Sequence, residues 1–253
     1  MSLLQITQVS KRFGGLQALA DVNLSIAAGQ IHGLIGPNGA GKTTLFNLIT
    51  GLYSADSGQF ALQGQNYRPR SVHQVTMAGI ARTFQNIRLF GDMSALDNVR
   101  VGRHSRSNAG LWDAIWRTKH FYHEEAQLRD QAHALLDYVG IGRYAQHRAN
   151  SLSYGDQRRL EIARALATEP RLLALDEPAA GMNASEKNVL RELIERIRAD
   201  GRTVLLIEHD VKLVAGICDR ITVLDNGRVI AEDTPDQVRR DPRVIEAYLG
   251  SSA

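Results

Sequence analysis

The sequence predicts an α/β protein with a mostly parallel central sheet, an antiparallel β subdomain at the N-terminal end, and an inserted helical subdomain. Short apolar runs, each long enough for one buried strand, alternate with helical patterns in the early and late parts of the chain. Residues 94–141, by contrast, carry apolar side chains at helical spacing throughout. We therefore expect the core to comprise residues 1–85 and 168–253, and the helical subdomain to comprise residues 86–167.

Local patterns predict each element. Alternating apolar and polar residues predict the first two strands, and near-continuous apolar runs predict the buried ones. Pro170 and Gly201 end the helices that precede them, and Asp225-Asn226-Gly227 is typical of a hairpin turn. In chain order we expect strands at 3–9, 18–26 and 30–35, a helix at 43–50, a strand at 59–62, a helix at 71–79, a strand at 80–85, helices between 94 and 141, a helix at 153–168, a strand at 171–175, a helix at 186–200, a strand at 203–207, a helix at 211–218, and a hairpin that begins at 220–224.

Composition narrows the class of protein. The 253 residues are 43% hydrophobic with a formal net charge of +3, which suits a globular α/β protein and does not argue for a nucleic-acid partner. The single cysteine, Cys218, lies in an apolar helical pattern and is expected to be a core residue. No run approaches the roughly 18 apolar residues of a membrane span, and the N-terminus lacks the layout of a signal peptide. A role at a membrane would therefore require a partner.

The segment GPNGAGKTT, which starts at Gly36, lies between an apolar strand and a helical pattern and fits a phosphate-binding loop. Gly36, Gly39 and Gly41 allow several backbone N–H groups to turn inward around a triphosphate. Lys42 can supply charge to the β- and γ-phosphates, and the Thr43 hydroxyl can ligate Mg²⁺. The sequence therefore predicts a nucleoside-triphosphate site in a phosphate-loop NTPase core, and a plain glycine-rich turn is the weaker alternative.

Three predicted strands lead into polar residues, namely Gln85, the pair Asp176-Glu177, and His209. Ligands of a parallel sheet gather at the C-terminal ends of its strands. Asp176 is then placed to hold Mg²⁺, and Glu177 has the right chemistry to activate an attacking water. His209 could contact the γ-phosphate, and Gln85 could orient water or metal. An ordinary helix cap is the alternative explanation of the acidic pair.

Other conspicuous residues have ordinary structural explanations. The basic run at 100–106 lacks the interleaved aromatic residues of a nucleic-acid arm and is expected to be a solvated loop. His120 and His123 are three residues apart but lack a third ligand, which disfavours a zinc site. Trp112 and Trp116 share one face of a predicted helix, and packing accounts for them.

The segment LSYGDQ at residues 152–157, followed by RRLEIARAL, resembles the signature segment of the ATP-binding subunits of ABC transporters. The order of aromatic loop, phosphate loop, Gln85, signature segment, acidic pair and His209 is also that of this family. The resemblance implies ATP and Mg²⁺ as cofactors, ATP hydrolysis, and a head-to-tail dimer of identical or paralogous copies. In that dimer ATP lies between the phosphate loop of one copy and the signature segment of the other, next to a second helix N-terminus.

The resemblance assigns site residues one by one. They are Phe13 for the adenine ring; Gly36, Asn38, Gly39, Gly41, Lys42, Thr43 and Thr44 for the phosphates; Ser153, Gly155 and Gln157 for the nucleotide of the opposite copy; Thr43, Gln85 and Asp176 for Mg²⁺; and Glu177, His209 and Gln85 for catalysis. Three residues depart from the family pattern. Tyr154 stands where glycine is usual, Asp156 where Gln or Glu is commoner, and Asn183 where Asp is usual, which alters the charge balance across the dimer.

Within the family the chain most resembles the ATPases of branched-chain, or hydrophobic, amino-acid importers. The resemblance rests on ARTFQNIRLF from residue 81, LDEPAAGMN from residue 175, and VIEAYLG from residue 244. It implies separate membrane-spanning permease subunits, indirectly a solute-binding protein, and a peripheral position on the cytoplasmic face of the inner membrane. ATPases for urea or lipopolysaccharide transport look similar. A soluble non-transport ABC ATPase and a nucleotide-binding module without turnover are two rival interpretations.

The loop NIRLFGDM at residues 86–93 is unusually apolar for a connecting segment. We expect it to form the lip of a groove that receives a short helix from the permease. The alternative is that its side chains complete the core of the helical subdomain.

Overall fold

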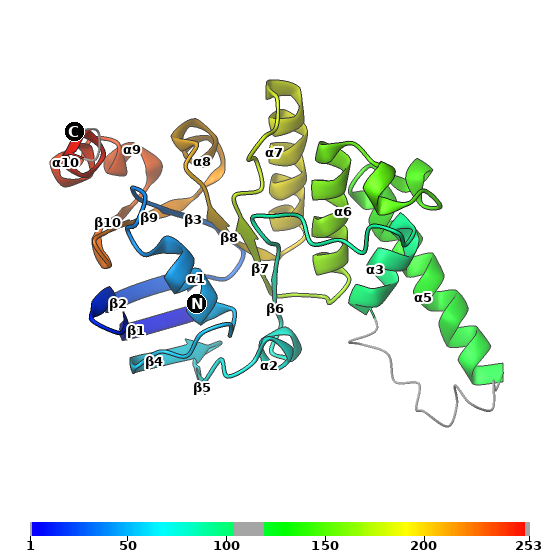
Figure 1. Cartoon of the computed structure of the whole chain (residues 1–253), viewed down its shortest axis with the longest axis horizontal. Coiled ribbons are helices and arrows are strands. Elements are labelled where there is room, and N and C mark those ends of the chain that lie inside the picture. Colours follow the sequence, from blue (N-terminus) through cyan, green and yellow to red (C-terminus); the bar gives the residue numbers. More distant parts are fainter. Residues whose placement is uncertain (1, 104–118, 251–253) are drawn as a thin grey trace. The chain divides into compact units, whose positions relative to one another are not determined.

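The computed structural model describes residues 2–103 and 119–250 (Figure 1). The described residues fall into two compact units, one formed from those in Met1–Arg82 and Arg171–Ala253, the other from those in Thr83–Pro170. Both tryptophans, Trp112 and Trp116, and residues 104–106 of the basic run lie outside the described residues, as do the side chains of His120 and His123.

The first unit is built on a six-stranded sheet with the order β10-β9-β3-β8-β7-β6. All neighbouring pairs are parallel except β9 and β10, which form the expected antiparallel hairpin. The prediction of a mostly parallel α/β core is therefore confirmed. The strands are β3 Ile31–Ile35, β6 Ile80–Arg82, β7 Leu172–Asp176, β8 Thr203–Ile207, β9 Arg220–Asp225 and β10 Arg228–Asp233.

The central strands β3, β7 and β8 are buried at every position, because helices and the second sheet cover both faces of the main sheet. Apolar residues on both faces explain why these strands are continuous hydrophobic runs and not alternating ones. The helices of this unit are α1 Lys42–Ile49, α2 Val72–Met77, α7 Ala184–Ala199, α8 Val211–Ile217, α9 Pro235–Val238 and α10 Pro242–Gly250. Asn183 is the N-cap of α7 and forms a capping box with Glu186.

A second sheet in the same unit has four antiparallel strands in the order β2-β1-β4-β5. This sheet confirms the predicted N-terminal β subdomain. Its strands are β1 Ser2–Phe13, β2 Leu16–Ala27, β4 Ser57–Leu62 and β5 Gln65–Tyr67. Side chains from β1 and β2 share one core with those of α1 and of the main sheet, including Leu4, Leu24, Phe46 and Leu205. This shared core fixes the β subdomain against the helix that follows the phosphate loop.

The second unit is helical. It contains α3 Ala95–Arg103, α5 Lys119–Tyr138, α6 Tyr154–Leu166 and the short 3₁₀ helices Gly142–Tyr144 and Ala149–Ser151. Val99 of α3, Leu136 of α5 and Leu160 of α6 are fully buried, so each of these three helices contributes to the core of this unit. Arg100 of α3 donates two hydrogen bonds to the carboxylate of Glu125 on α5, at 2.9 and 2.7 Å. The expectation of a solvated loop is therefore wrong for residues 100–103 of the basic run, which are helical.

Several element boundaries differ from the sequence-based expectation, and two of the differences concern predicted site residues. Strand β6 ends at Arg82, so Gln85 lies in the following loop and not at a strand end. Strand β1 continues to Phe13, because Phe13 pairs with Leu16 of β2 across the two-residue turn Gly14-Gly15. Strand β5 was not expected, since its polar side chains carry no apolar alternation.

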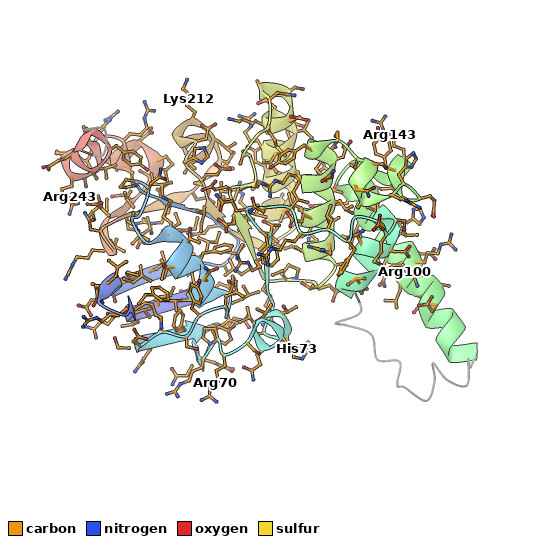
Figure 2. The ribbon with its side chains drawn as sticks, in the orientation of Figure 1. Arg70, His73, Arg100, Arg143, Lys212 and Arg243 are labelled. Carbon is orange, nitrogen blue, oxygen red and sulfur yellow. The ribbon has the colours of Figure 1, made fainter. Side chains whose placement is uncertain are left out.

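No helix among the described residues is long and apolar enough to cross a bilayer. In the first unit the basic residues Arg70, Lys212 and Arg243 lie at widely separated positions (Figure 2).

Candidate functional site

The phosphate loop joins β3 to α1 in the first unit, as predicted. Gly36, Gly39 and Gly41 have φ angles of 150°, 81° and 103°, a region that favours glycine. A Cβ on Gly36 would collide with the carbonyl oxygen of Leu224, and one on Gly41 would lie 2.8 Å from Ala18 O. The loop is therefore held closely between β9 and β2, and side chains are excluded at these two positions.

Lys42 begins α1 and is buried. Its Nζ donates to Gly36 O at 2.7 Å and to Pro37 O at 2.9 Å, so the ammonium lies inside the curve of the loop. Burial lowers the pKa of Lys42, and the nearby charge of Glu177 opposes that effect. Asn38 and Thr43 are exposed and Thr44 is half-buried, which leaves their polar groups at the surface of the loop and of the first helical turn.

The acidic pair lies in the same sheet, with one strand between it and β3. Asp176 ends β7, and it is paired in register with Ile207, the last residue of β8. The Asp176 carboxylate is buried, with Oδ2 3.8 Å from Nη2 of Arg82 on the edge strand β6. Arg82 also donates to Asn47 Oδ1 at 3.0 Å and to Thr50 Oγ1 at 2.8 Å. It therefore links Asp176 to α1, a role that the sequence analysis missed because only the fold brings these residues together.

Glu177 and His209 are brought together as the sequence predicted. The backbone of Glu177 has a φ of 45°, which is uncommon for a side chain of this kind, and its N–H donates to Ile207 O at 2.9 Å. His209 Nδ1 lies 3.8 Å from Glu177 Oε2, and the His209 side chain is 65% exposed. The two side chains therefore face the same space at the ends of β7 and β8.

Glu208, which the sequence analysis also missed, is fully buried beside them. Its carboxylate accepts hydrogen bonds from Ala179 N at 2.8 Å and from His209 N at 3.2 Å. Burial raises the pKa of Glu208, and these backbone hydrogen bonds oppose the increase. Glu208 thus ties the loop after Glu177 to the backbone of His209. A charged residue directly after an apolar strand was the available signal in the sequence.

Phe13 lies at the tip of the β1–β2 hairpin with 43% of its surface exposed. Its ring meets the ring of Tyr53 edge to face, with centroids 5.3 Å apart and an interplanar angle of 71°. Lys11 Nζ lies 5.4 Å from the centroid of the Phe13 ring. The predicted base-stacking residue is therefore an exposed ring that contacts Tyr53 and Lys11.

The signature segment belongs to the second unit, where it starts α6. Ser153 is the N-cap, its hydroxyl accepting from Asp156 N at 3.2 Å and donating to Asp156 Oδ2 at 2.7 Å. Gln157 Nε2 donates to Leu152 O at 2.9 Å, and Gly155 is buried. Asp156, one of the departures from the family pattern, thus completes a cap that Gln or Glu could also form.

Gln85 is also in the second unit, and α6 holds its backbone. Arg158 donates to Phe84 O at 2.7 Å and to Gln85 O, and it stacks on the ring of Tyr154 with 5.2 Å between Cζ and the ring centroid. Tyr154 OH accepts from Arg158 at 2.8 Å. The unusual tyrosine of the signature segment therefore supports the arginine that fixes the Gln85 loop.

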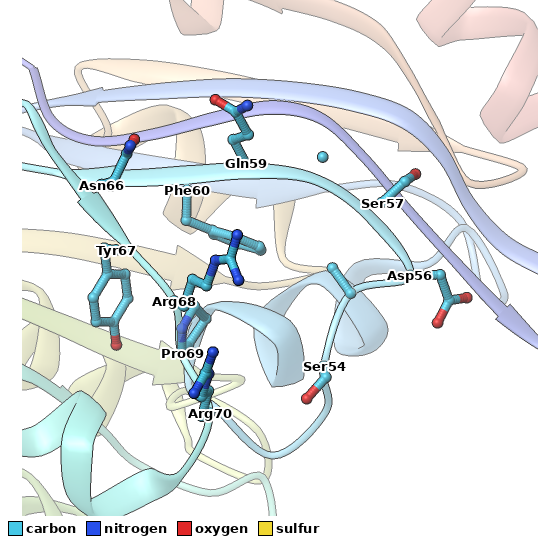
Figure 3. Close-up of a pocket in the computed structure, with 12 residues that line it drawn as sticks. Ser54, Asp56, Ser57, Gln59, Phe60, Asn66, Tyr67, Arg68, Pro69 and Arg70 are labelled. Carbon is cyan, nitrogen blue, oxygen red and sulfur yellow. The ribbon is translucent and has the colours of Figure 1, made fainter.

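Two further features do not belong to this site. A surface hollow of about 420 Å³ lies in the β subdomain, lined by residues 54–60 and 66–70 (Figure 3), and it contains no predicted site residue. Cys218 is buried, and burial raises the pKa of its thiol to about 12, as expected of a core residue. In the part of the chain that the structure describes, no group of three His, Cys, Asp or Glu residues is placed to hold a metal by itself.

A glycine-rich loop between a buried parallel strand and a helix, with an acidic strand end in the same sheet, defines the P-loop nucleoside-triphosphatase class. Comparison with known proteins gives the family. The family model described as ABC transporter matches residues 19–180, and that described as branched-chain amino acid ATP-binding cassette transporter matches residues 228–253. The chain belongs to the ABC transporter family, as an ATP-binding cassette homologous to transport ATPases.

Individual relatives agree with this assignment. The chain is 45% identical over 251 residues to the high-affinity branched-chain amino acid transport ATP-binding protein LivG of Escherichia coli K12, covering 99% of this chain and 98% of that protein. A crystal structure of an ATP-binding cassette of an ABC transporter in its ADP conformation superposes with a TM-score of 0.86 at 31% identity, covering 99% of each chain. A dimeric cassette bound to ADP and Pi superposes with a TM-score of 0.77 at 26% identity, covering 92% of this chain and 98% of that one.

Proposed function

We propose that this chain is the ATP-hydrolysing subunit of an importer for branched-chain or other hydrophobic amino acids. It would work with separate membrane-spanning permease subunits, and through them with a solute-binding protein, at the cytoplasmic face of the inner membrane. The observation that carries the catalytic part is the placement of the phosphate loop, Asp176, Glu177 and His209 at one edge of one parallel sheet. The names of the relatives support the amino-acid substrate.

The phosphates of ATP would lie on the backbone N–H groups of residues 36–44 at the start of α1. Lys42 is already inside the curve of the loop and would exchange a carbonyl contact for the β- and γ-phosphates. The Thr43 hydroxyl and the Asp176 carboxylate are hard oxygen donors, the kind that Mg²⁺ takes together with phosphate oxygens, and Gln85 is the third residue assigned to it. When bound, the metal ion would neutralise charge on the phosphates.

Glu177 would take a proton from water as the water oxygen bonds to the γ-phosphorus and the bond to the β–γ bridging oxygen breaks. ADP and inorganic phosphate are then the products. His209, 3.8 Å from the Glu177 carboxylate, is placed to contact the γ-phosphate or to orient that carboxylate. Ser153, Gly155 and Gln157 would contact the nucleotide held by a second cassette in a head-to-tail dimer, and the dimeric relative supports such an assembly.

The loop at residues 86–93 would receive a short helix from the permease. The Asn98 side chain holds the backbone of this loop at Phe90 through two hydrogen bonds. Its Oδ1 accepts from Phe90 N at 2.9 Å, and its Nδ2 donates to Phe90 O at 3.0 Å. The Phe90 ring nevertheless remains 50% exposed, so it is not needed to fill the core of the second unit. A fixed backbone with an exposed aromatic ring suits a contact with an apolar partner helix.

The catalytic assignment is tested by Glu177→Gln, which keeps the shape of the side chain and removes the base. We expect phosphate release to fall by about a hundredfold or more, while ATP affinity is retained and an ATP-dependent dimer accumulates. Glu192→Gln, which alters an exposed carboxylate on α7, is the matched control and should hydrolyse ATP normally. Phosphate release by Glu177→Gln at the rate of the control would show that Glu177 is not the base.

The transport assignment is tested separately by purifying the chain from membranes and identifying the bound subunits. We expect permease subunits in the complex, and ATP hydrolysis stimulated by leucine, isoleucine or valine with the solute-binding protein present. Stimulation by urea instead would contradict the amino-acid substrate. A chain that hydrolyses ATP but binds no membrane subunit would favour the soluble, non-transport alternative.

A further inference from the structure

The end of α1 leads directly into a segment that touches the base-stacking end of the hairpin. Tyr53 follows α1 by four residues, and its backbone N–H donates to Asn47 O at 3.1 Å, which ties it to the helix. Its ring packs edge to face on Phe13. The aromatic residue assigned to the base is therefore in contact with an extension of the same helix that follows the phosphate loop.

Asp56, three residues further on, binds the strand that carries Phe13. Its Oδ1 accepts from Lys11 Nζ at 2.7 Å, its Oδ2 accepts from Arg12 N at 2.7 Å, and its own N–H donates to Ser10 O at 3.0 Å. These bonds involve the three consecutive residues that precede Phe13. The hydrogen bond from Lys11, followed by that from Arg12, lowers the pKa of Asp56, so the carboxylate is ionised at neutral pH.

The Asp56 side chain takes the place of a missing strand neighbour. On the β4 side, the pairing of β1 with β4 reaches Ser10, which is opposite Ser57. Beyond that point the Arg12 N–H is satisfied by the Asp56 carboxylate. Gly58 makes this close approach possible, because a Cβ there would lie 2.5 Å from Gln8 O. The segment after α1 is thus pressed against β1 just before the hairpin tip.

We propose that Tyr53 and Asp56 are positioning residues that hold the Phe13 ring in place for base stacking. Phe13 ends a strand at an exposed two-residue turn, where an unsupported ring would sample several rotamers and lose part of its stacking free energy on ordering. The Tyr53 ring limits its rotation, and Asp56 fixes both the backbone before it and the Lys11 ammonium beside it. The inference rests on the proposed stacking of adenine on Phe13.

Figure 3 shows Asp56 on this segment, where it helps to line the hollow of the β subdomain. Because α1 rises only about 1.5 Å per residue, its eight residues span about 12 Å between the phosphate loop and the segment that leads to Tyr53. The helix would then set the spacing between the phosphate-binding and base-binding ends of the site.

The test compares ATP with inorganic tripolyphosphate, which carries the phosphates without a base, by calorimetry on the full chain. Phe13→Ala is the reference and should weaken ATP binding by about fivefold or more while leaving tripolyphosphate binding unchanged. Tyr53→Ala and Asp56→Ala should each weaken ATP binding by about threefold or more, again with tripolyphosphate binding unchanged. Tyr53→Phe, which keeps the ring edge, should bind ATP as the wild type does.

Asp97→Ala removes a comparably exposed, ion-paired carboxylate in the second unit and is the matched control; it should change neither affinity. Combining Asp56→Ala with Phe13→Ala should add no further loss, since both act through one ring.

Equal losses for ATP and tripolyphosphate would overturn the positioning role, as would normal ATP binding by both Tyr53→Ala and Asp56→Ala. If Phe13→Ala itself binds ATP normally, the stacking role within the proposed function is wrong and the inference fails with it. Should Asp56→Ala not fold, Asp56→Asn supplies the same comparison.

Discussion

Acidification should destabilise the core through one buried histidine, His32, in the central strand β3. Burial, and secondarily the charge of Arg220, lowers the pKa of His32 from 6.5 to about 4. Gln30 Nε2 lies 2.7 Å from Nδ1, and Thr222 Oγ1 lies 2.8 Å from Nε2. Because an amide nitrogen only donates, Nδ1 accepts this bond and the proton of the neutral ring lies on Nε2. Protonation of Nδ1 would place its N–H opposite the amide N–H of Gln30, so this hydrogen bond would be lost.

The magnitude follows from proton linkage. The unfolded chain takes up a proton near pH 6.5, whereas the folded chain resists it until about pH 4. The contribution of His32 to stability is therefore complete above pH 6.5 and is lost as the pH falls toward 4, because the unfolded state binds more protons in that window. At about 1.36 kcal/mol per pH unit, the loss is about 2 kcal/mol at pH 5 and about 3 kcal/mol at pH 4.

The assay is urea unfolding followed by circular dichroism at pH 7 and pH 5, for the wild type and for His32→Gln. Other groups titrate in this range in both proteins, so the difference between the two pH dependences isolates the histidine. Glutamine can keep a hydrogen bond to Thr222 but does not ionise. We expect the wild type to lose about 2 kcal/mol more than the variant between the two pH values. Equal losses would refute the assignment of a buried, neutral His32.

Three further predictions concern the site. Lys42→Ala should weaken nucleotide binding itself, because it removes the charge inside the phosphate loop; unchanged ATP affinity by calorimetry would contradict this. Gly36→Ala should abolish nucleotide binding or lower the melting temperature, since a Cβ collides with Leu224 O, whereas Gly216→Ala, which has open space around it and no positive φ, is the milder control. Leu89→Ser with Phe90→Ser should leave the isolated chain folded and hydrolysing ATP but prevent assembly with the permease; unfolding of this variant, or normal transport, would show that the loop is not the docking lip.

The order of the elements and the phosphate loop could be predicted because the information is local. Strand β3 is a short, mostly apolar run, and the glycines that follow mark a loop whose φ angles other residues rarely adopt, so the strand, loop and helix could be placed to within a residue. The hairpin at Asp225-Asn226-Gly227 was equally accessible, since turn residues specify their own backbone.

Contacts between distant segments could not be predicted in the same way. Arg82 and Asp176 are far apart in sequence, and only the pairing of β6 with β7 brings them together. The same holds for Asp56 with Lys11, and for Glu208 with the backbone of Ala179. The type of each residue does not reveal its partner. In the sequence alone, an exposed carboxylate cannot be distinguished from a buried one that positions a distant segment, because that difference depends on the topology.

The helical unit is inserted between two strands, β6 and β7, that pair directly with each other in the main sheet. The chain leaves the core after β6 and re-enters it at β7, its immediate neighbour, where Gly79 O accepts from both Arg171 N at 2.7 Å and Leu172 N at 3.1 Å. Segments whose two ends are already side by side can be lengthened, shortened or exchanged with little entropic cost to the host. The length and sequence of the inserted segment can therefore change without altering the register in which β6 pairs with β7.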